Sequence, residues 1–156
     1  MRAKSFRWRC LAVLFTCAAL AFDPIATPAH AQDKPTRIVI LGPAEEPRFS
    51  EVAGGLRQGL RDQGYAPAAL DILEAKVARG DDDAARATTE QAVRGGAALI
   101  FVIGSELTRA ARQVSADIPI VFISPGDPVA AGLAASLARP GGNTTAMTFE
   151  YPELSA

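Results

Sequence analysis

Short, continuous runs of apolar residues alternate along this chain with longer stretches in which apolar residues recur every three or four positions. The runs are rich in β-branched residues and are bounded by glycine and proline, which is typical of strands buried on both faces of a parallel sheet. Strands are therefore expected at residues 38–41, 70–75, 98–103, 118–123 and 144–149. The second run has the weakest pattern, which favours an edge position for that strand.

The stretch after the first strand predicts an amphipathic helix. Ser50 is its candidate N-cap and Gly64 its candidate C′ residue. Apolar residues recur there at four-residue spacing: Val52, Leu56 and Leu60. Glycine lowers helix stability, so we attribute three interior glycines to close packing of this helix on the sheet: Gly54, Gly55 and Gly59.

Three more helices are expected further along the chain. One spans about 84–94 and follows three aspartates at 81–83, which lack the ligand spacing of a calcium loop and are interpreted as capping residues. Another spans about 106–115. The last runs from Pro128 to the turn at Arg139, because its apolar residues form one stripe: Val129, Leu133 and Leu137.

Strands and helices thus alternate, with short loops between them. Right-handed crossovers then give a three-layer α/β/α fold with a five-stranded parallel sheet in the Rossmann-like order 2-1-3-4-5. Ligands of such sheets bind at the carboxyl ends of the strands. That edge is expected to consist of the loops after Leu41, Ile103 and Ile123.

Residues 1–31 have the pattern of a cleaved secretory signal peptide. Arg2 begins a basic segment, residues 10–22 are apolar apart from Thr16, and Ala29-His30-Ala31 fits an A-x-A cleavage site. The apolar segment is too short for a transmembrane helix. The chain is therefore expected to be periplasmic or otherwise exported, with cleavage after Ala31.

Removal of this leader takes away every cysteine, histidine and tryptophan. The remaining chain then has no thiolate or imidazole for catalysis or metal binding, which excludes most hydrolytic mechanisms, and no cofactor is predicted. The leader also contains four basic residues and one acidic residue, and its loss changes the formal net charge from −1 to −4. Nucleic-acid binding is disfavoured, since it requires a basic surface.

Two loops at the expected ligand edge contain candidate binding groups. Gly104 leads into a helix whose free N–H groups favour an anion such as a carboxylate, with Ser105 and Thr108 available for hydroxyl contacts. Ser105 is equally explained as a helix N-cap. Asp127 before Pro128 fits either an N-cap or an acceptor for a ligand ammonium or hydroxyl. The loop after Leu41 matches no nucleotide-binding motif.

Four segments of the chain have a family pattern: RQGLRDQGY at 57–65, IPIVF at 118–122, GDPV at 126–129 and GLAASLARPGGNTT at 132–145. They resemble the periplasmic substrate-binding proteins of ABC transporters, in the type I group associated with amino acids. The resemblance covers nearly all of residues 37–155. One departure is Gly104-Ser105-Glu106-Leu107, where the family more often has Gly-Thr-Pro-Ala.

The resemblance implies a non-enzymatic protein that binds a small solute between two lobes and delivers it to a membrane permease. This chain would supply the N-terminal lobe at 32–149, with a hinge crossing and the start of a second lobe at 150–156. A second lobe, or its gene product, is then an expected partner. The expected ligand-binding residues are Pro43, Ala44, Gly104, Ser105, Thr108, Ser124, Gly126, Asp127 and Glu150.

Two other hypotheses stay open from the sequence. The chain resembles the family only as far as the start of a helix in the second lobe, so it is alternatively a truncated product without independent activity. The other hypothesis is an exported α/β enzyme that uses carboxylates alone, for example Glu45, Glu46 and Asp127.

Overall fold

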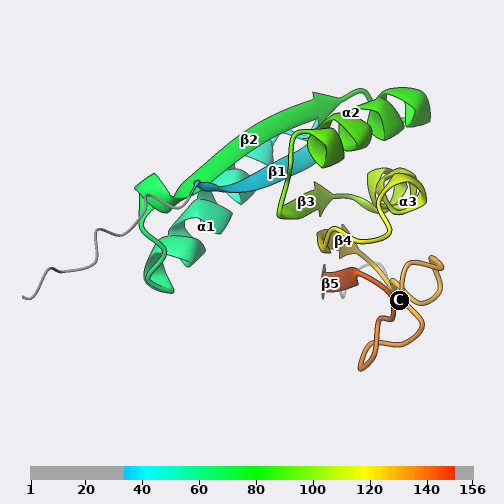
Figure 1. Ribbon diagram of the computed structural model, residues 1–156. Coiled ribbons are helices and arrows are strands. Elements are labelled where there is room, and N and C mark those ends of the chain that lie inside the picture. The colour runs from blue at the N-terminus through cyan, green and yellow to red at the C-terminus, as the bar shows by residue number, and fades with distance from the viewer. Residues whose placement is uncertain (1–33, 150–156) are drawn as a thin grey trace, which may run out of the picture. The chain divides into compact units, whose positions relative to one another are not determined.

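Five parallel strands form a single sheet in the computed structural model, which describes residues 34–149 (Figure 1). The strand order is β2-β1-β3-β4-β5, which confirms the predicted order. The strands are β1 (Thr36–Pro43), β2 (Leu70–Val77), β3 (Leu99–Ile103), β4 (Ile120–Pro125) and β5 (Thr144–Phe149). All five therefore end at the same edge of the sheet, and β2 lies at one side of it, as its weak pattern predicted.

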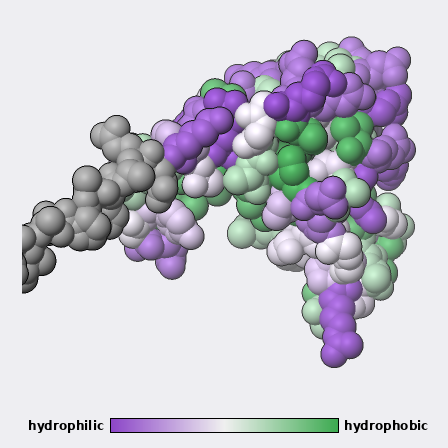
Figure 2. All heavy atoms as spheres, in the orientation of Figure 1, coloured by the Kyte–Doolittle hydropathy of each residue, from purple (hydrophilic) through white to green (hydrophobic). Residues whose placement is uncertain are grey.

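Helices cover both faces of this sheet, which confirms the α/β class. They are α1 (Phe49–Asp62), α2 (Asp82–Arg94) and α3 (Ser105–Val114). Figure 1 shows α1 and α2 on opposite sides of β1 and β2. Side chains of α2 and α3 pack with alternate strand residues such as Val102 and Phe122, whereas α1 packs on the other face against Ile40 and Phe101. The outward surface of α2 is hydrophilic (Figure 2).

The start and end of α2 follow from its sequence. The Asp81 carboxylate accepts a hydrogen bond from the Ala84 N–H at 2.9 Å, which satisfies one of the free donors of the first turn and confirms the capping prediction. At the other end, Gly96 has φ +73°, and the Gly96 and Ala97 N–H groups donate back to Val93 and Ala92. This is a Schellman motif, and it ends the helix where the two glycines predicted.

The first helix differs from its prediction in two respects. Arg48 is its N-cap residue without a side-chain hydrogen bond, so the assignment of Ser50 as the cap is wrong. The packing explanation for its three glycines is also wrong, because a Cβ atom at Gly54, Gly55 or Gly59 would meet nothing within 4 Å. The close contact is made by Gly42 instead, where a Cβ would lie 2.6 Å from two ring carbons of Phe49.

The helix predicted after β4 is absent, and turns connect Gly126 to β5. One helical turn does begin, since the Ala131 N–H donates to the Asp127 carbonyl. Gly132 then adopts φ +70°, and the Gly132 and Leu133 N–H groups donate to Val129 and Pro128 in the Schellman pattern. The helix thus ends after a single turn, because a glycine in the left-handed conformation reverses the chain and directs Leu133 into the core.

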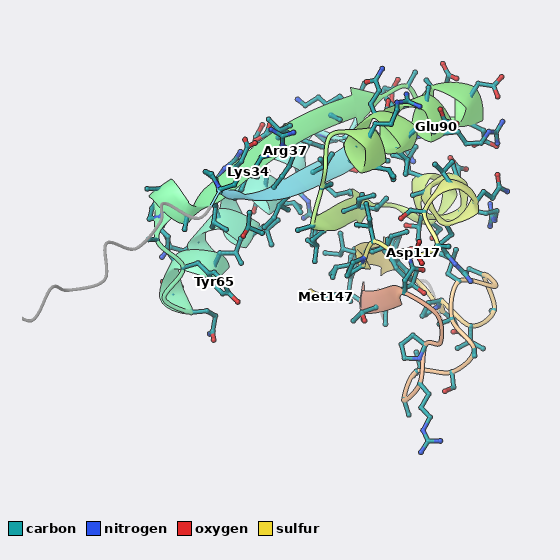
Figure 3. The ribbon with its side chains drawn as sticks, in the orientation of Figure 1. Lys34, Arg37, Tyr65, Glu90, Asp117 and Met147 are labelled. Atoms are coloured by element: carbon teal, nitrogen blue, oxygen red, sulfur yellow. The ribbon has the colours of Figure 1, made fainter. Side chains whose placement is uncertain are left out.

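The opposite edge of the sheet, where the strands begin, is joined by Arg37 near the start of β1 (Figure 3). Its Nε and Nη2 atoms each lie 2.8 Å from Oδ2 of Asp71 on β2, and its Nη1 atom donates to the Gly95 carbonyl after α2. The Arg37 side chain therefore links β1 to β2 and to the end of α2, at the edge of the sheet opposite the strand ends.

Part of the sheet face on the α1 side is less covered over β4 and β5. Val121 and Ile123 are half-buried, and the neighbouring Met147 on β5 is 63% exposed (Figure 3). Within residues 34–149, no helix combines the length and apolar character needed to cross a membrane.

Candidate functional site

Two adjacent cavities lie at the edge of the sheet where the strands end. The larger has a volume of about 310 Å³ and the smaller about 200 Å³. Both are lined by residues from the ends of β1, β3 and β4 and from the loops after β2 and β3: Pro43, Arg79, Ile103, Gly104 and Pro125. This is the edge that the sequence predicted for ligand binding, and the larger cavity falls within the range of small-molecule sites.

The remaining lining residues differ between the two cavities. The larger is bounded by the loop before α1, by α1 itself and by the ends of β4 and β5: Glu46, Pro47, Arg48, Val52, Ile123 and Phe149. The smaller is bounded by the first turn of α3: Ser105, Glu106 and Leu107. The first N–H groups of a helix have no acceptor within it, so the smaller cavity lies beside backbone donors as well as a carboxylate.

Ser105 at the start of α3 and Ser124 near the end of β4 are joined by a hydrogen bond between their hydroxyl groups. The Ser124 hydroxyl also donates to the Pro125 carbonyl at 3.1 Å. A hydroxyl has a single proton, so Ser105 is then the donor of the bond to Ser124. Ser105 lines the smaller cavity with acceptor lone pairs available, while Ser124 is buried and supports it from below.

Removing the buried member of this pair is expected to destabilise the protein modestly. Ser124→Ala leaves the Ser105 hydroxyl without its partner and should lower the free energy of unfolding by about 1 kcal/mol. Urea unfolding followed by circular dichroism measures this change. Ser50→Ala is the matched control, because the exposed Ser50 does not cap α1, and its substitution should change stability by less than about 0.5 kcal/mol. Equal stability of wild type and Ser124→Ala would contradict the inferred support.

Several other predicted site residues lie at this edge without lining either cavity. The Thr108 hydroxyl is fully buried and donates to the Gly104 carbonyl at 2.7 Å, so its proton is committed within α3. The exposed Asp127 carboxylate accepts from the Val129 N–H at 2.7 Å and so caps the single helical turn that begins there, which confirms the capping prediction although the long helix is absent. The Ala44 N–H donates to Val77, and the Gly126 N–H to Phe149. Glu150 lies outside the described residues.

The carboxylates that the sequence offered to an enzyme are occupied by backbone groups. Glu45 accepts from the Arg79 N–H and Glu46 from the Arg48 N–H, both at 3.2 Å, and Asp127 is engaged as described above. No group of three or more histidine, cysteine, aspartate or glutamate residues suited to a metal ion occurs between residues 34 and 149.

Two arginines at the cavities were missed by sequence reasoning. Arg79 follows β2, which extends to Val77, two residues beyond the predicted end of the strand. The loop after β2 was therefore not counted among the loops at the ligand edge. The usable signal was that β2, as one of five parallel strands, ends at the same edge as the other four. Arg48 precedes α1 and lines the larger cavity only. It lies in the loop after β1, which the sequence did place at the ligand edge, but nothing in the sequence distinguished Arg48 from the other charged residues of that loop.

Comparison with known proteins identifies the family and the type of fold. The family model for the ABC transporter substrate binding protein matches residues 37–152. A tyrosine-binding protein from Clostridioides difficile (strain R20291) is 31% identical over 107 residues, which make up 69% of this chain and 31% of that protein.

Solved structures give the same picture. An open, ligand-free substrate binding protein with adhesive properties from Clostridium difficile is similar with a TM-score of 0.66 and 27% identity, over 74% of this chain and 39% of that one. An ABC domain in complex with L-Trp from Streptococcus pneumonia has a TM-score of 0.66 at 24% identity, with the same two coverages.

The fold is therefore that of an α/β periplasmic binding protein. The chain belongs to the ABC transporter substrate-binding protein family. It spans about a third of the length of the curated relative and about two fifths of the solved structures. The family and the open structure are described as substrate binding proteins, and the curated relative as a tyrosine-binding protein.

Proposed function

We propose that this chain forms the N-terminal lobe of an exported solute-binding protein of an ABC-type uptake transporter, and that it binds an amino acid at the carboxyl edge of its sheet. The observation that carries the proposal is the pair of cavities at that edge in a chain of this family. The tyrosine-binding relative and the L-Trp complex support an amino acid, in particular an aromatic one, as the solute.

In this proposal Pro43, Gly104 and Ser105 contact the ligand, since all three line a cavity. Ser124 and Thr108 hold the loops that present those residues. Apolar walls such as Ile103 and Phe149 would contact an aromatic ring, whereas Glu106 and the Ser105 lone pairs would accept from an ammonium group.

The rest of the proposal concerns the complete assembly. Residues 1–31 direct export, 32–149 form the lobe, and 150–156 begin the crossing to a second lobe that closes over the ligand. Closure between two lobes stabilises the bound state because the ligand then contacts both. A membrane permease accepts the solute. A lobe that acts alone should bind weakly, since it makes only part of these contacts.

Nuclear magnetic resonance titration of the purified protein with L-tyrosine and L-tryptophan tests the proposal. The backbone amide signals of Gly104, Ser105 and Glu106 are expected to shift, with a dissociation constant in the millimolar range because half of the contacts are missing. Signals of Arg37 and Gly95 at the opposite edge serve as the internal control and should stay in place. Shifts confined to that opposite edge, or no shift with either amino acid, would refute an amino-acid site here.

A further inference from the structure

We propose that Arg79 is a specificity-determining residue that binds the carboxylate of the ligand. The inference deepens the proposed function, since it assigns one group of the solute to one side chain. Arg79 is the one charged residue among those shared by the two cavities, whereas Arg48, Glu46 and Glu106 each line one of them. A ligand in either cavity, or across both, thus lies near this arginine.

The backbone that carries Arg79 is held on both sides. The Asp81 N–H donates to the Ala78 carbonyl, and Gly80 between them has φ +80°, which is the pattern of a type II turn with Arg79 at its second position. The Arg79 N–H donates to the Glu45 carboxylate at 3.2 Å. Asp81 in turn caps α2, so the turn is fixed to that helix. A positioned backbone lowers the entropy lost when the side chain binds a ligand.

The guanidinium of Arg79 is available for an anion. Each of the four ion pairs found in residues 34–149 uses another arginine: Arg37, Arg57, Arg86 and Arg94. Within that part of the chain, the Arg79 side chain makes neither an ion pair nor a hydrogen bond. A guanidinium presents two parallel N–H donors that match the two oxygens of a carboxylate.

The hydroxyl groups nearby leave this role unfilled. The Thr108 proton is donated to Gly104, and the Ser105 proton to Ser124, so a carboxylate that used either hydroxyl would have to break a bond within the protein. Both protons are thus committed within the protein. The donors that remain beside the smaller cavity are the first N–H groups of α3 and the Arg79 side chain. Glu106 on the other wall of that cavity suits the opposite charge of a zwitterion.

Three probes that share one ring test this assignment by NMR titration of the purified protein. They are L-tyrosine, 4-hydroxyphenylpropionate, which lacks the ammonium group, and tyramine, which lacks the carboxylate. Arg79→Gln is expected to weaken binding of both carboxylates by about tenfold and to leave tyramine unchanged. Arg79→Lys keeps the charge without the paired donors, so an intermediate loss of about threefold is expected. The initial slope of shift against concentration measures each change.

Arg139→Gln is the matched control, because Arg139 is also exposed and its guanidinium has no bond among residues 34–149, yet it lines neither cavity. This variant should bind all three probes like the wild type. The assignment is overturned if Arg79→Gln binds the carboxylates within twofold of wild type, if it loses tyramine equally, or if the wild type binds no carboxylate probe. If L-tyrosine binds equally well to the wild type and to Arg79→Gln, the Arg79 assignment fails and the proposed amino-acid function is unaffected. If 4-hydroxyphenylpropionate binds in an Arg79-dependent way and L-tyrosine does not bind, the amino-acid function fails and the assignment of a carboxylate to Arg79 is unaffected.

Discussion

Replacement of Gly42 by alanine is expected to lower the free energy of unfolding by about 2 kcal/mol, which is within the usual cost of overpacking a core. The new Cβ would lie 2.6 Å from the Cδ2 and Cε2 atoms of Phe49 and 3.3 Å from Cδ1 of Ile103. The Phe49 ring is 1% exposed and packs with Ile40 and Phe101, so it has little room to move. Urea unfolding followed by circular dichroism measures the loss.

A double-mutant cycle identifies the cause of this loss. Phe49→Leu removes the two ring carbons that the new methyl would meet, so Gly42→Ala should cost less in the Phe49→Leu background than in the wild type. Gly54→Ala is the control for the same substitution where a Cβ meets nothing within 4 Å. Costs for Gly42→Ala that are equal in both backgrounds would refute the contact. The site is affected as well, because Phe49 is adjacent to Arg48 at the larger cavity.

The sheet was predictable because the physics of its strands is local. A strand covered on both faces must be apolar at every position, and runs such as those at 38–41 and 98–103 have that property. The order of the strands then follows from right-handed crossovers and alternating elements. The strand ends were less predictable: β1 continues through Gly42 and Pro43, because β2 remains paired with it as far as Pro43, whereas the pairing with β3 ends at Leu41.

The absent helix shows where a periodic pattern is insufficient. The stripe that predicted it consists of residues with very different environments, since Leu133 is 1% exposed, Val129 38% and Leu137 68%. Periodicity reports which side chains would share a face if the backbone were helical, and it carries no information on whether a glycine adopts positive φ. Gly132 does so here, and the favourable hydrogen bonds of the Schellman motif compete with continuation of the helix.

The position of the site was predictable from topology, but its charges were not. Loops at the carboxyl ends of parallel strands meet in space wherever they lie in the sequence, which is why Pro43, Gly104 and Ser105 were expected together. Which of their polar groups face a ligand depends on bonds between distant residues. Ser105 and Ser124 are 19 positions apart, and the bond from Ser124 to the Pro125 carbonyl decides which of the two hydroxyls donates to the other.

If Arg79 binds a carboxylate, then polar, apolar and charged residues each have a separate role in the site. The short polar side chains hold the loops in place, the apolar strand ends form the walls, and the charged groups come from loops before α1, before α2 and in α3. These loops differ in length and sequence more easily than the strands do. The sheet edge thus provides the place for a solute, while residues such as Arg79 and Glu106 determine which solute is preferred.

Replacement of all three glycines of α1 by alanine is expected to stabilise the protein by about 2–3 kcal/mol, because glycine costs a helix close to 1 kcal/mol per residue against alanine. Gly54, Gly55 and Gly59 are exposed, none has positive φ, and an added Cβ at each meets nothing within 4 Å. The gain arises mainly from the lower entropy of the unfolded chain, so no new contact is required. Thermal unfolding should show a melting temperature raised by roughly 4 °C for each kcal/mol.

The same substitution at Gly64 provides the control with the opposite sign. Gly64 follows α1 with φ +89°, and its N–H and that of Tyr65 donate to Arg61 and Leu60 in a Schellman motif. A Cβ at Gly64 also meets nothing within 4 Å, so Gly64→Ala tests conformation alone and should destabilise by about 1 kcal/mol. A triple variant that is less stable than the wild type would show that the glycine face of α1 is packed in solution, since only a covering surface could turn the added methyl groups into a cost.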